Sequence, residues 1–143
     1  TSGQDMVLFD EVISKIIQSA AELSTRPNQI KITKDGEFGA IQSLIATPLA
    51  LVLTELIHNA LEHGLSEIGD SVIVSVSKNE STMITSVIDN GIGIPEGFSL
   101  ENNTNLGLQI VQTLTLNELA GSIEFIKPER GTEVKLTLPL NRN

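Results

Sequence analysis

Apolar residues recur at helical spacing in three stretches of the chain, over residues 9–20, 48–63 and 106–119. Positions three and four apart lie on one face of an α-helix, so each stretch predicts an amphipathic helix. Thr47-Pro48 combines a capping residue with a proline at the first helical position, and it predicts a helix start at that point. The predicted inner face of the third helix comprises Leu106, Ile110, Val111 and Leu114.

Strand-like alternation fills the segments between these helices. Ile30 and Ile32 alternate with polar residues towards Asp35-Gly36, which predicts a short strand pair around that turn. Two hairpins are predicted further along, one formed by 72–76 with 83–89 and the other by 123–125 with 134–138.

The order of these elements predicts an α+β fold. Helices and strand pairs alternate in a way that favours a two-layer α/β sandwich, in which a mixed, mostly antiparallel sheet carries the helices on one face. The length of 143 residues suits a single domain, 1–143. We expect residues 1–7 to be disordered or a linker, 47–138 to form the core that carries the motifs, and the polar segment 95–105 to be a loop.

Polar side chains gather on one side of the helix predicted over 48–63, in its last two turns. They are Glu55, His58, Asn59, Glu62 and His63. A solvated helix face is the ordinary explanation of such a side. This side lacks lysine and arginine, and nearer the helix start it continues into Leu51 and Val52. On spacing alone, a ligand-facing helix end is therefore an equal alternative.

Asp89 to Pro95 (DNGIGIP) closes the strand predicted over 83–89. Asn-Gly by itself is a strong hairpin signal, and a type I′ turn would explain it. A hairpin requires an alternating strand directly after the turn, whereas here another glycine, a proline and a polar loop follow. Gly91 and Gly93 therefore favour backbone that bends twice and approaches a ligand closely. Asp89 beside them can accept a hydrogen bond from an exocyclic amine.

Two weaker signals lie nearer the C-terminus. Asn105-Leu106-Gly107-Leu108 opens the third helix, and the free N–H groups of a helix start favour phosphate, although any helix after a glycine offers the same. Gly131-Thr132 is explained by a tight turn in the last hairpin.

The composition narrows the classes of ligand. The net charge is −9, and the chain has four phenylalanines but no tryptophan or tyrosine. Few basic and aromatic residues argue against nucleic-acid binding through phosphates or stacking platforms. The absence of cysteine excludes disulfides and thiolate metal sites, and it weakly favours a reducing compartment. No apolar run approaches about 18 residues, so we expect no direct membrane contact.

Taken in order and at these distances, the segments resemble the ATP-binding domain of sensor histidine kinases, within the superfamily that includes gyrase, Hsp90 and MutL. The asparagine box is LTELIHNALEHG, the glycine boxes are VIDNGIGIP and NLGLQIV, and Gly131-Thr132 closes the set. The resemblance covers about residues 47–138. It implies a Bergerat-type ATP-binding fold, ATP and Mg2+ as cofactors, and protein histidine kinase activity in the cytoplasm.

The resemblance also implies roles for the matched positions. Glu55 would be the general base or polarising acid, Asn59 the protein ligand of Mg2+, and Asp89 the acceptor of the adenine amine. Gly91, Gly93 and Thr132 would shape the adenine pocket, with a lid over 95–106. His63, Gly107 and Leu108 would lie near the phosphates. The other matched cofactor-binding positions are Glu62, Ile94 and Leu106.

The sequence departs from the family pattern at two positions. Glu62 stands where many relatives carry a basic residue, and Asn105 stands where the second glycine box usually begins with a glycine. The chain's histidines, His58 and His63, both lie in the asparagine box, so neither suits a phosphoacceptor. The chain begins with threonine and without a signal-peptide pattern, and we expect the acceptor on an upstream dimerisation domain. A response regulator would be an indirect partner.

Other functions of the same superfamily remain open at this point. A standalone serine kinase that acts as an anti-sigma factor would explain the missing acceptor histidine. A degenerate nucleotide sensor would explain Asn105 and Glu62. The ATPase module of a topoisomerase-like machine would require a transducer segment, which the chain lacks.

Overall fold

The computed structural model of the protein describes residues 5–26, 28–65, 67–94, 98 and 105–140. Its elements in chain order are β1 (Met6–Leu8), α1 (Phe9–Leu23), β2 (Lys31–Asp35), β3 (Ala40–Gln42), α2 (Ser43–Asn59), a π-helical turn η1 (Ala60–Gly64), β4 (Ser71–Lys78), β5 (Thr82–Asp89), α3 (Leu106–Thr113), a second π-helical turn η2 (Leu114–Glu118), β6 (Ser122–Ile126) and β7 (Thr132–Pro139).

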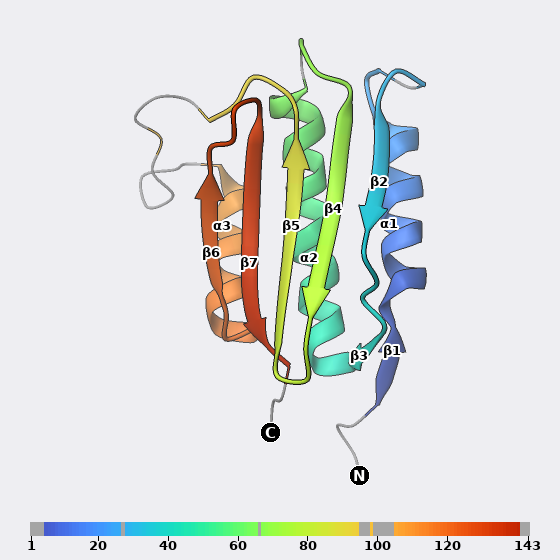
Figure 1. The fold of residues 1–143 in the computed structure, drawn as a ribbon, viewed down its shortest axis with the longest axis vertical. Helices are drawn as coiled ribbons and strands as arrows, with labels where there is room; N and C mark the ends of the chain where they lie inside the picture. Colours follow the sequence, from blue (N-terminus) through green and yellow to red (C-terminus); the bar gives the residue numbers. More distant parts are fainter. Residues whose placement is uncertain (1–4, 27, 66, 95–97, 99–104, 141–143) are drawn as a thin grey trace.

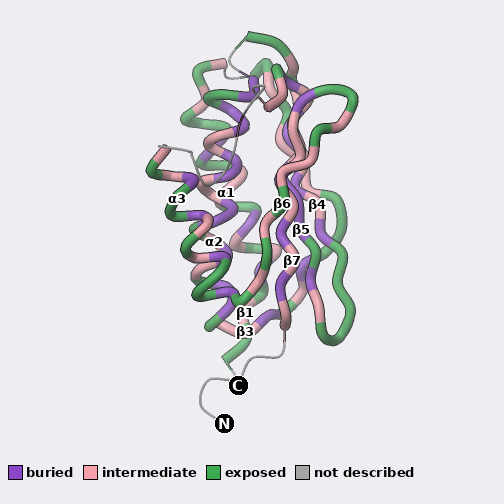
Figure 2. Tube along the Cα trace, turned by 90° about the vertical axis from the view of Figure 1, so that its left-hand side faces the viewer, coloured by how far each residue is buried: buried purple, intermediate pink, exposed green. Residues whose placement is uncertain are grey.

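The larger sheet has the strand order β2-β4-β5-β7-β6. β2 and β4 run parallel, and every other neighbouring pair in this sheet is antiparallel. Figure 1 looks onto the sheet with α1, α2 and α3 behind it, and Figure 2 shows the helices and the sheet as two layers. The prediction of a two-layer α+β sandwich with a mixed sheet and helices on one face is therefore confirmed.

The core lies between the two layers and is mostly aliphatic. Val72, Val74 and Val76 of β4 are buried, while the residues between them are partly exposed, as expected for a strand with one covered face. α2 packs against α1 and α3 and against the middle of the sheet, and seven of its side chains are buried. Both predicted hairpins form, β4 with β5 and β6 with β7.

The strand pair predicted around Asp35-Gly36 is wrong. β2 pairs with β4 in parallel, and β3 pairs with β1 to make a separate two-stranded sheet. Gly36 and Gly39 have φ values of 99° and 69°, in the left-handed region. The chain therefore bends twice between β2 and β3, and β3 leaves the edge of the larger sheet.

The predicted linker over 1–7 does not extend through Met6 and Val7. These residues form β1 with Leu8 and pair with Gln42 and Ile41 of β3. Residues 1–4 lie outside the described part of the chain.

The second helix begins five residues earlier than predicted, at Ser43, so Pro48 lies inside α2. A proline there donates no hydrogen bond to the carbonyl four residues back. Burial of Ile45 and Ala46 nevertheless keeps the preceding turn helical, because packing outweighs the local signal for a helix start at Thr47-Pro48. Val52, which the helical wheel placed on the polar side, is fully buried.

Ser43–Gly64 forms a continuous helix of 22 residues that is long and apolar enough to cross a bilayer. The expectation that no run reaches this length is therefore wrong. Inside the protein, however, 56% of the apolar window is buried, because α2 packs against the sheet and both other helices. A core helix of this kind needs no membrane.

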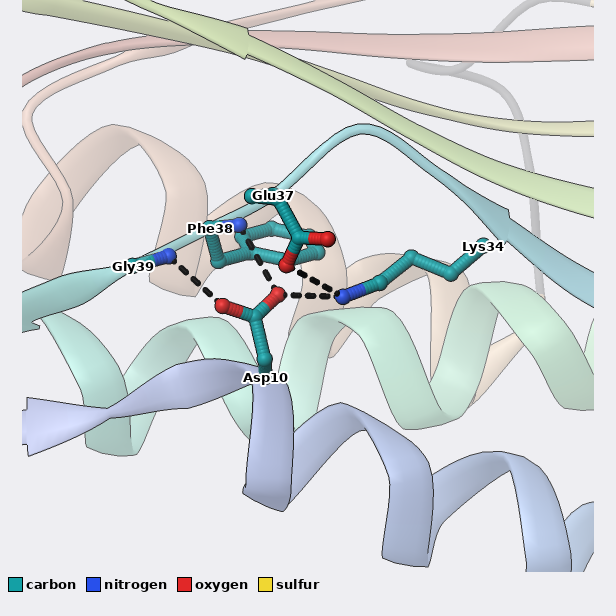
Figure 3. Close-up of polar contacts among 5 residues, drawn as sticks. All are labelled: Asp10, Lys34, Glu37, Phe38 and Gly39. Carbon is teal, nitrogen blue, oxygen red and sulfur yellow. Dashed lines mark hydrogen bonds and ion pairs between the residues drawn. The ribbon is translucent and has the colours of Figure 1, made fainter.

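A carboxylate on α1 holds the loop between β2 and β3 in place (Figure 3). Asp10 accepts hydrogen bonds from the backbone N–H groups of Phe38, at 2.9 Å, and Gly39, at 2.8 Å. The Lys34 ammonium lies 2.6 Å from the same carboxylate and 2.9 Å from Glu37. The Phe38 ring packs on Phe9 with centroids 5.0 Å apart, so the loop is fixed by both polar and apolar contacts.

Burial alone would raise the pKa of Asp10, but Lys34 and the two backbone donors outweigh it and lower this pKa from 3.8 to about 2. A carboxyl group whose pKa falls on folding stabilises the fold above its unfolded pKa. That contribution is about 2 kcal/mol near neutral pH, and it disappears as the pH falls from about 4 to about 2.

Asp10→Asn should therefore lower the free energy of unfolding by about 2 kcal/mol near neutral pH, because the amide cannot replace the charge. Urea unfolding at about pH 7 and about pH 2.5 measures the difference, which should shrink strongly at the lower pH. Glu11→Gln, an exposed neighbour on the same helix, is the matched control and should change little. A difference that is the same at both pH values would contradict the assigned role.

Candidate functional site

A cavity of about 450 Å3 opens at the end of the sheet that is drawn uppermost in Figure 1. It lies between the C-terminal end of the α2–η1 helix, the end of β5, the start of α3 and the turn between β6 and β7. Its lining residues are Leu56, Asn59, Glu62, His63, Gly64, Asp89, Ile92, Gly93, Ile94, Phe98, Asn105, Leu108, Phe125 and Thr132. The polar end of the helix and the glycine-flanked aspartate thus share one cavity.

A backbone hydrogen bond joins the wall formed by the α2–η1 helix to the wall formed by the segment after β5. The N–H of Ile92 donates to the carbonyl of Gly64 at 2.9 Å, which ties the segment after β5 to the end of η1. A Cβ on Gly91 would lie 1.6 Å from that same carbonyl oxygen, so only glycine permits this approach. Gly91 therefore closes the wall from behind and does not itself line the cavity.

Asp89 is the buried polar group of the cavity, with 6% of its surface exposed. It ends β5 and stands opposite Thr132, the first residue of β7. Its carboxylate accepts a hydrogen bond from the N–H of Gly91 at 2.8 Å. Burial raises the pKa of Asp89, and the backbone donors of Gly91 and Thr132 only partly oppose that shift. One carboxylate is thus held still by backbone and presented to a ligand-sized space.

The start of α3 forms another wall of the cavity. Asn105 caps this helix, and its side-chain oxygen accepts from the N–H of Leu108 at 3.2 Å. Both residues line the cavity. Gly107 lies against Glu55 of α2, because a Cβ on Gly107 would come within 2.6 Å of a Glu55 carboxylate oxygen.

Most predicted site residues meet in the cavity. Those that line it are Asn59, Glu62, His63, Asp89, Gly93, Ile94, Leu108 and Thr132. Glu55, Gly91 and Gly107 do not line it, but Gly91 lies against Gly64 and Asp89, and Gly107 lies against Asn105 and Glu55. Leu106 is the exception, because its side chain is 68% exposed and points away from the core. Ile110 is also exposed, so the predicted inner face of the third helix is wrong at these two positions.

Sequence reasoning missed several lining residues, and the aromatic ones are the most informative. Phe98 and Phe125 pack together with ring centroids 5.1 Å apart, and both line the cavity. Phe98 is the one aromatic residue of the polar segment 95–105, which was a usable signal. Apart from Phe98, the predicted lid over 95–106 is described only at its final two residues. Leu56, Gly64, Ile92 and Asn105 were also not predicted to contact ligand.

The side chains that line the cavity suit a hard cation that takes only part of its coordination shell from the protein and the rest from a bound molecule. The side-chain amide nitrogen of Asn59 is buried without a hydrogen-bond partner in the described part of the chain. Turning that amide over would present its oxygen at the same point. Among the described residues no three His, Asp or Glu side chains gather into a metal cage. Mg2+ typically takes one or two protein oxygens and completes its shell with phosphate and water.

Comparison with known proteins identifies relatives of this arrangement. The family model described as histidine kinase-, DNA gyrase B-, and HSP90-like ATPase matches residues 45–142. The sensor histidine kinase PdtaS of Mycobacterium tuberculosis is 38% identical over 99% of this chain and 29% of its own length. The blue-light-activated histidine kinase 2 of Erythrobacter litoralis is 30% identical over 79% of this chain and 33% of its own length. The chain therefore spans about a third or less of these relatives.

Solved structures share the fold over nearly the whole chain. The histidine kinase domain of a blue-light activated histidine kinase from Erythrobacter litoralis superimposes with a TM-score of 0.84 at 25% identity, covering 98% of this chain and 65% of that one. The Acinetobacter baumannii histidine kinase AdeS has a TM-score of 0.77 at 18% identity, covering 96% and 68%, which concerns the fold alone.

Proposed function

Since this chain belongs to the histidine kinase-, DNA gyrase B- and HSP90-like ATPase family, we propose that it is the catalytic domain that binds Mg-ATP in a sensor histidine kinase. The domain would transfer the γ-phosphoryl group to a histidine on an upstream dimerisation domain. Membership of the family implies ATP binding. The cation, the acceptor and the remainder of the kinase are the parts that we propose.

One observation carries the proposal: Asp89 and Asn59 line a single cavity from opposite elements. The buried carboxylate at the end of β5 offers an acceptor to an exocyclic amine, and the amide at the end of α2 offers a ligand to a cation. A purine nucleotide has both an amine and a phosphate chain, and the start of α3, which lines the same cavity, can receive the phosphate chain. The relatives with matching sequence are sensor histidine kinases.

The proposed roles divide between the two ends of the nucleotide. Asp89, Gly93, Ile94 and Thr132 would hold the adenine end, and Gly91 would shape its wall from behind. The phosphate end would be held by Asn59, Glu62, His63, Gly107 and Leu108, with Leu106 contributing backbone only.

Glu55 would act on the proton of the attacking histidine or polarise the reacting groups. Its position beside Gly107 puts the carboxylate next to the start of α3. Mg2+, when bound, would neutralise phosphate charge that this acidic chain would otherwise repel.

The partners and location follow from the same proposal. The chain would work on its own kinase's dimerisation domain, and a response regulator would receive the phosphoryl group from that domain. We propose a cytoplasmic location, because the reaction consumes ATP. The whole chain, 1–143, would be one catalytic domain. The serine kinase and anti-sigma alternative is not favoured, since the matching relatives are sensor histidine kinases.

Titration with a non-hydrolysable ATP analogue tests the proposal. In isothermal calorimetry the analogue should bind with Mg2+ present, and chelation by EDTA should weaken binding by about tenfold or more, because the net charge is −9 and the phosphate chain is anionic. The corresponding guanine analogue is the control and should not bind, because its ring carries an oxygen where Asp89 requires an amine. Equal affinity with and without EDTA would contradict the proposed role of Mg2+. No heat of binding under either condition would contradict nucleotide binding itself.

A further inference from the structure

We propose that Asn105 competes with the phosphate chain for the start of α3, and so sets the affinity for ATP independently of the affinity for adenine. The inference rests on the proposed function and deepens it. It concerns a residue that lines the cavity and stands where a glycine would leave the helix start open.

The basis for this competition is the hydrogen bond with which Asn105 caps α3. The side-chain oxygen of Asn105 accepts from the N–H of Leu108 at 3.2 Å, while its backbone oxygen accepts from the N–H of Gln109 at 3.1 Å. The Leu108 amide has one hydrogen, and Leu108 lines the cavity in which the phosphate chain would bind. A phosphate oxygen can take this donor only if the Asn105 side chain turns away.

A second oxygen lies close to the same point. A Cβ built on Gly107 would be 2.6 Å from a Glu55 carboxylate oxygen and 3.2 Å from the Asn105 amide oxygen. Both oxygens therefore approach the first turn of α3 from the side of Gly107. This is the positive end of the helix, and a carboxylate oxygen and an amide oxygen already lie beside it before any phosphate arrives.

The structure also shows why this competition acts on one end of the ligand only. Asn105 and Leu108 line the cavity from the start of α3, whereas Asp89 and Thr132 line it from the paired ends of β5 and β7. The backbone donors to Asp89 are Gly91 and Thr132, so removing the Asn105 side chain should leave these contacts unchanged. The residue should therefore alter binding of ligands with a phosphate chain and leave binding of adenosine unchanged.

Asn105→Gly separates the capping of α3 by Asn105 from its competition with phosphate for the Leu108 N–H. Glycine at an N-cap costs only a few tenths of a kcal/mol relative to asparagine, so α3 should persist in this variant. The freed Leu108 donor should then tighten binding of the ATP analogue by about fivefold. Asn105→Asp supplies the opposite change, because its carboxylate caps the helix more strongly and repels phosphate; it should weaken the analogue by about tenfold.

The experiment titrates wild type and both variants with Mg-ATP analogue by calorimetry and with adenosine by NMR chemical shifts. The expected result is a rank order of glycine, asparagine and aspartate for the analogue, with adenosine affinity equal in all three. If the affinity for the analogue is unchanged in both variants, the proposed role of Asn105 is wrong, although the proposed adenine pocket is not contradicted. A change of the same size for adenosine and analogue would overturn it as well. Failure of wild type to bind either ligand would instead contradict the proposed function.

Discussion

Asp89→Asn should abolish binding of adenine nucleotides while the fold remains intact. The wild-type carboxylate can accept a hydrogen bond from the adenine amine, and a bond to a charged acceptor contributes about 1.5–3 kcal/mol. An asparagine whose oxygen stays on the Gly91 N–H would turn its NH2 group towards the ligand, so two donors would meet. We expect the affinity for the ATP analogue to fall by about 100-fold or more.

Stability should not fall in this variant, which separates a binding defect from unfolding. Burial raises the pKa of Asp89, so the folded state holds this carboxylate in its charged form at a cost in free energy. For an acid with a raised pKa, the stability of the fold declines as the pH rises from the unfolded pKa of 3.8 through the folded pKa. A neutral amide removes that cost. Thermal unfolding at neutral pH should show a Tm equal to or above that of wild type.

The matched control is Asp70→Asn, at an exposed carboxylate that accepts from the side chain of Asn90 at 3.0 Å. This residue lies near the same loop and outside the cavity, so its substitution should leave nucleotide affinity unchanged. Calorimetry on wild type and both variants gives the comparison. Unchanged affinity in Asp89→Asn would place the adenine amine elsewhere, and an equal loss in both variants would show that the effect is not specific to Asp89.

Local sequence pattern was sufficient for elements whose partners are close in the chain. The hairpins β4–β5 and β6–β7 were predicted because each needs only alternation and a short turn. The two walls of the cavity were also recognisable as segments that could face a ligand, because the end of the second helix and the end of β5 are both marked by glycine.

Pairing over longer separations could not be read in the same way. β2 finds its parallel partner in β4, with Lys31 opposite Ser71, across the whole of α2. No local signal marks such a partner, and Asp35-Gly36 offered a false hairpin instead. The start of α2 shows a related difficulty, because burial of Ile45 and Ala46 carries the helix back beyond the start signal at Thr47-Pro48.

The phase of the third helix was ambiguous for a different reason. Apolar residues stand almost all around it, so the 3.6-residue period allowed more than one inner face. The structure buries Leu108, Val111 and Thr115 and leaves Leu106 exposed. The position of Phe125 in the cavity had no local signal either, since a strand residue near a turn resembles any other. The cap at Asn105 could have been predicted from residue type alone.

Glu55→Gln in the full-length kinase should abolish phosphorylation of the acceptor histidine while nucleotide binding is retained. Glutamine keeps the size of the side chain and its fit against Gly107, but it cannot accept a proton or polarise the attacking group. Loss of a general base typically lowers a rate by about 100-fold to 10,000-fold. Incorporation of labelled phosphate measures the rate, and calorimetry with the ATP analogue measures binding.

Asn59→Ala, one helical turn away, should give the complementary defect. Its amide nitrogen is buried without a partner among the described residues, so its loss should remove the proposed cation ligand rather than the base. Binding of the analogue should weaken in the presence of Mg2+ and change little in EDTA. Glu55→Gln, by contrast, should bind Mg-nucleotide as wild type does.

Glu11→Gln on α1 is the control for the charge change, because Glu11 is exposed and lies outside the cavity. It should leave both phosphorylation and binding unchanged. Normal phosphorylation by Glu55→Gln would show that Glu55 is not the general base, and its role would then be to position the start of α3. An equal loss of affinity in magnesium and in EDTA for Asn59→Ala would assign Asn59 to the nucleotide itself, because a cation ligand can act only when the cation is present.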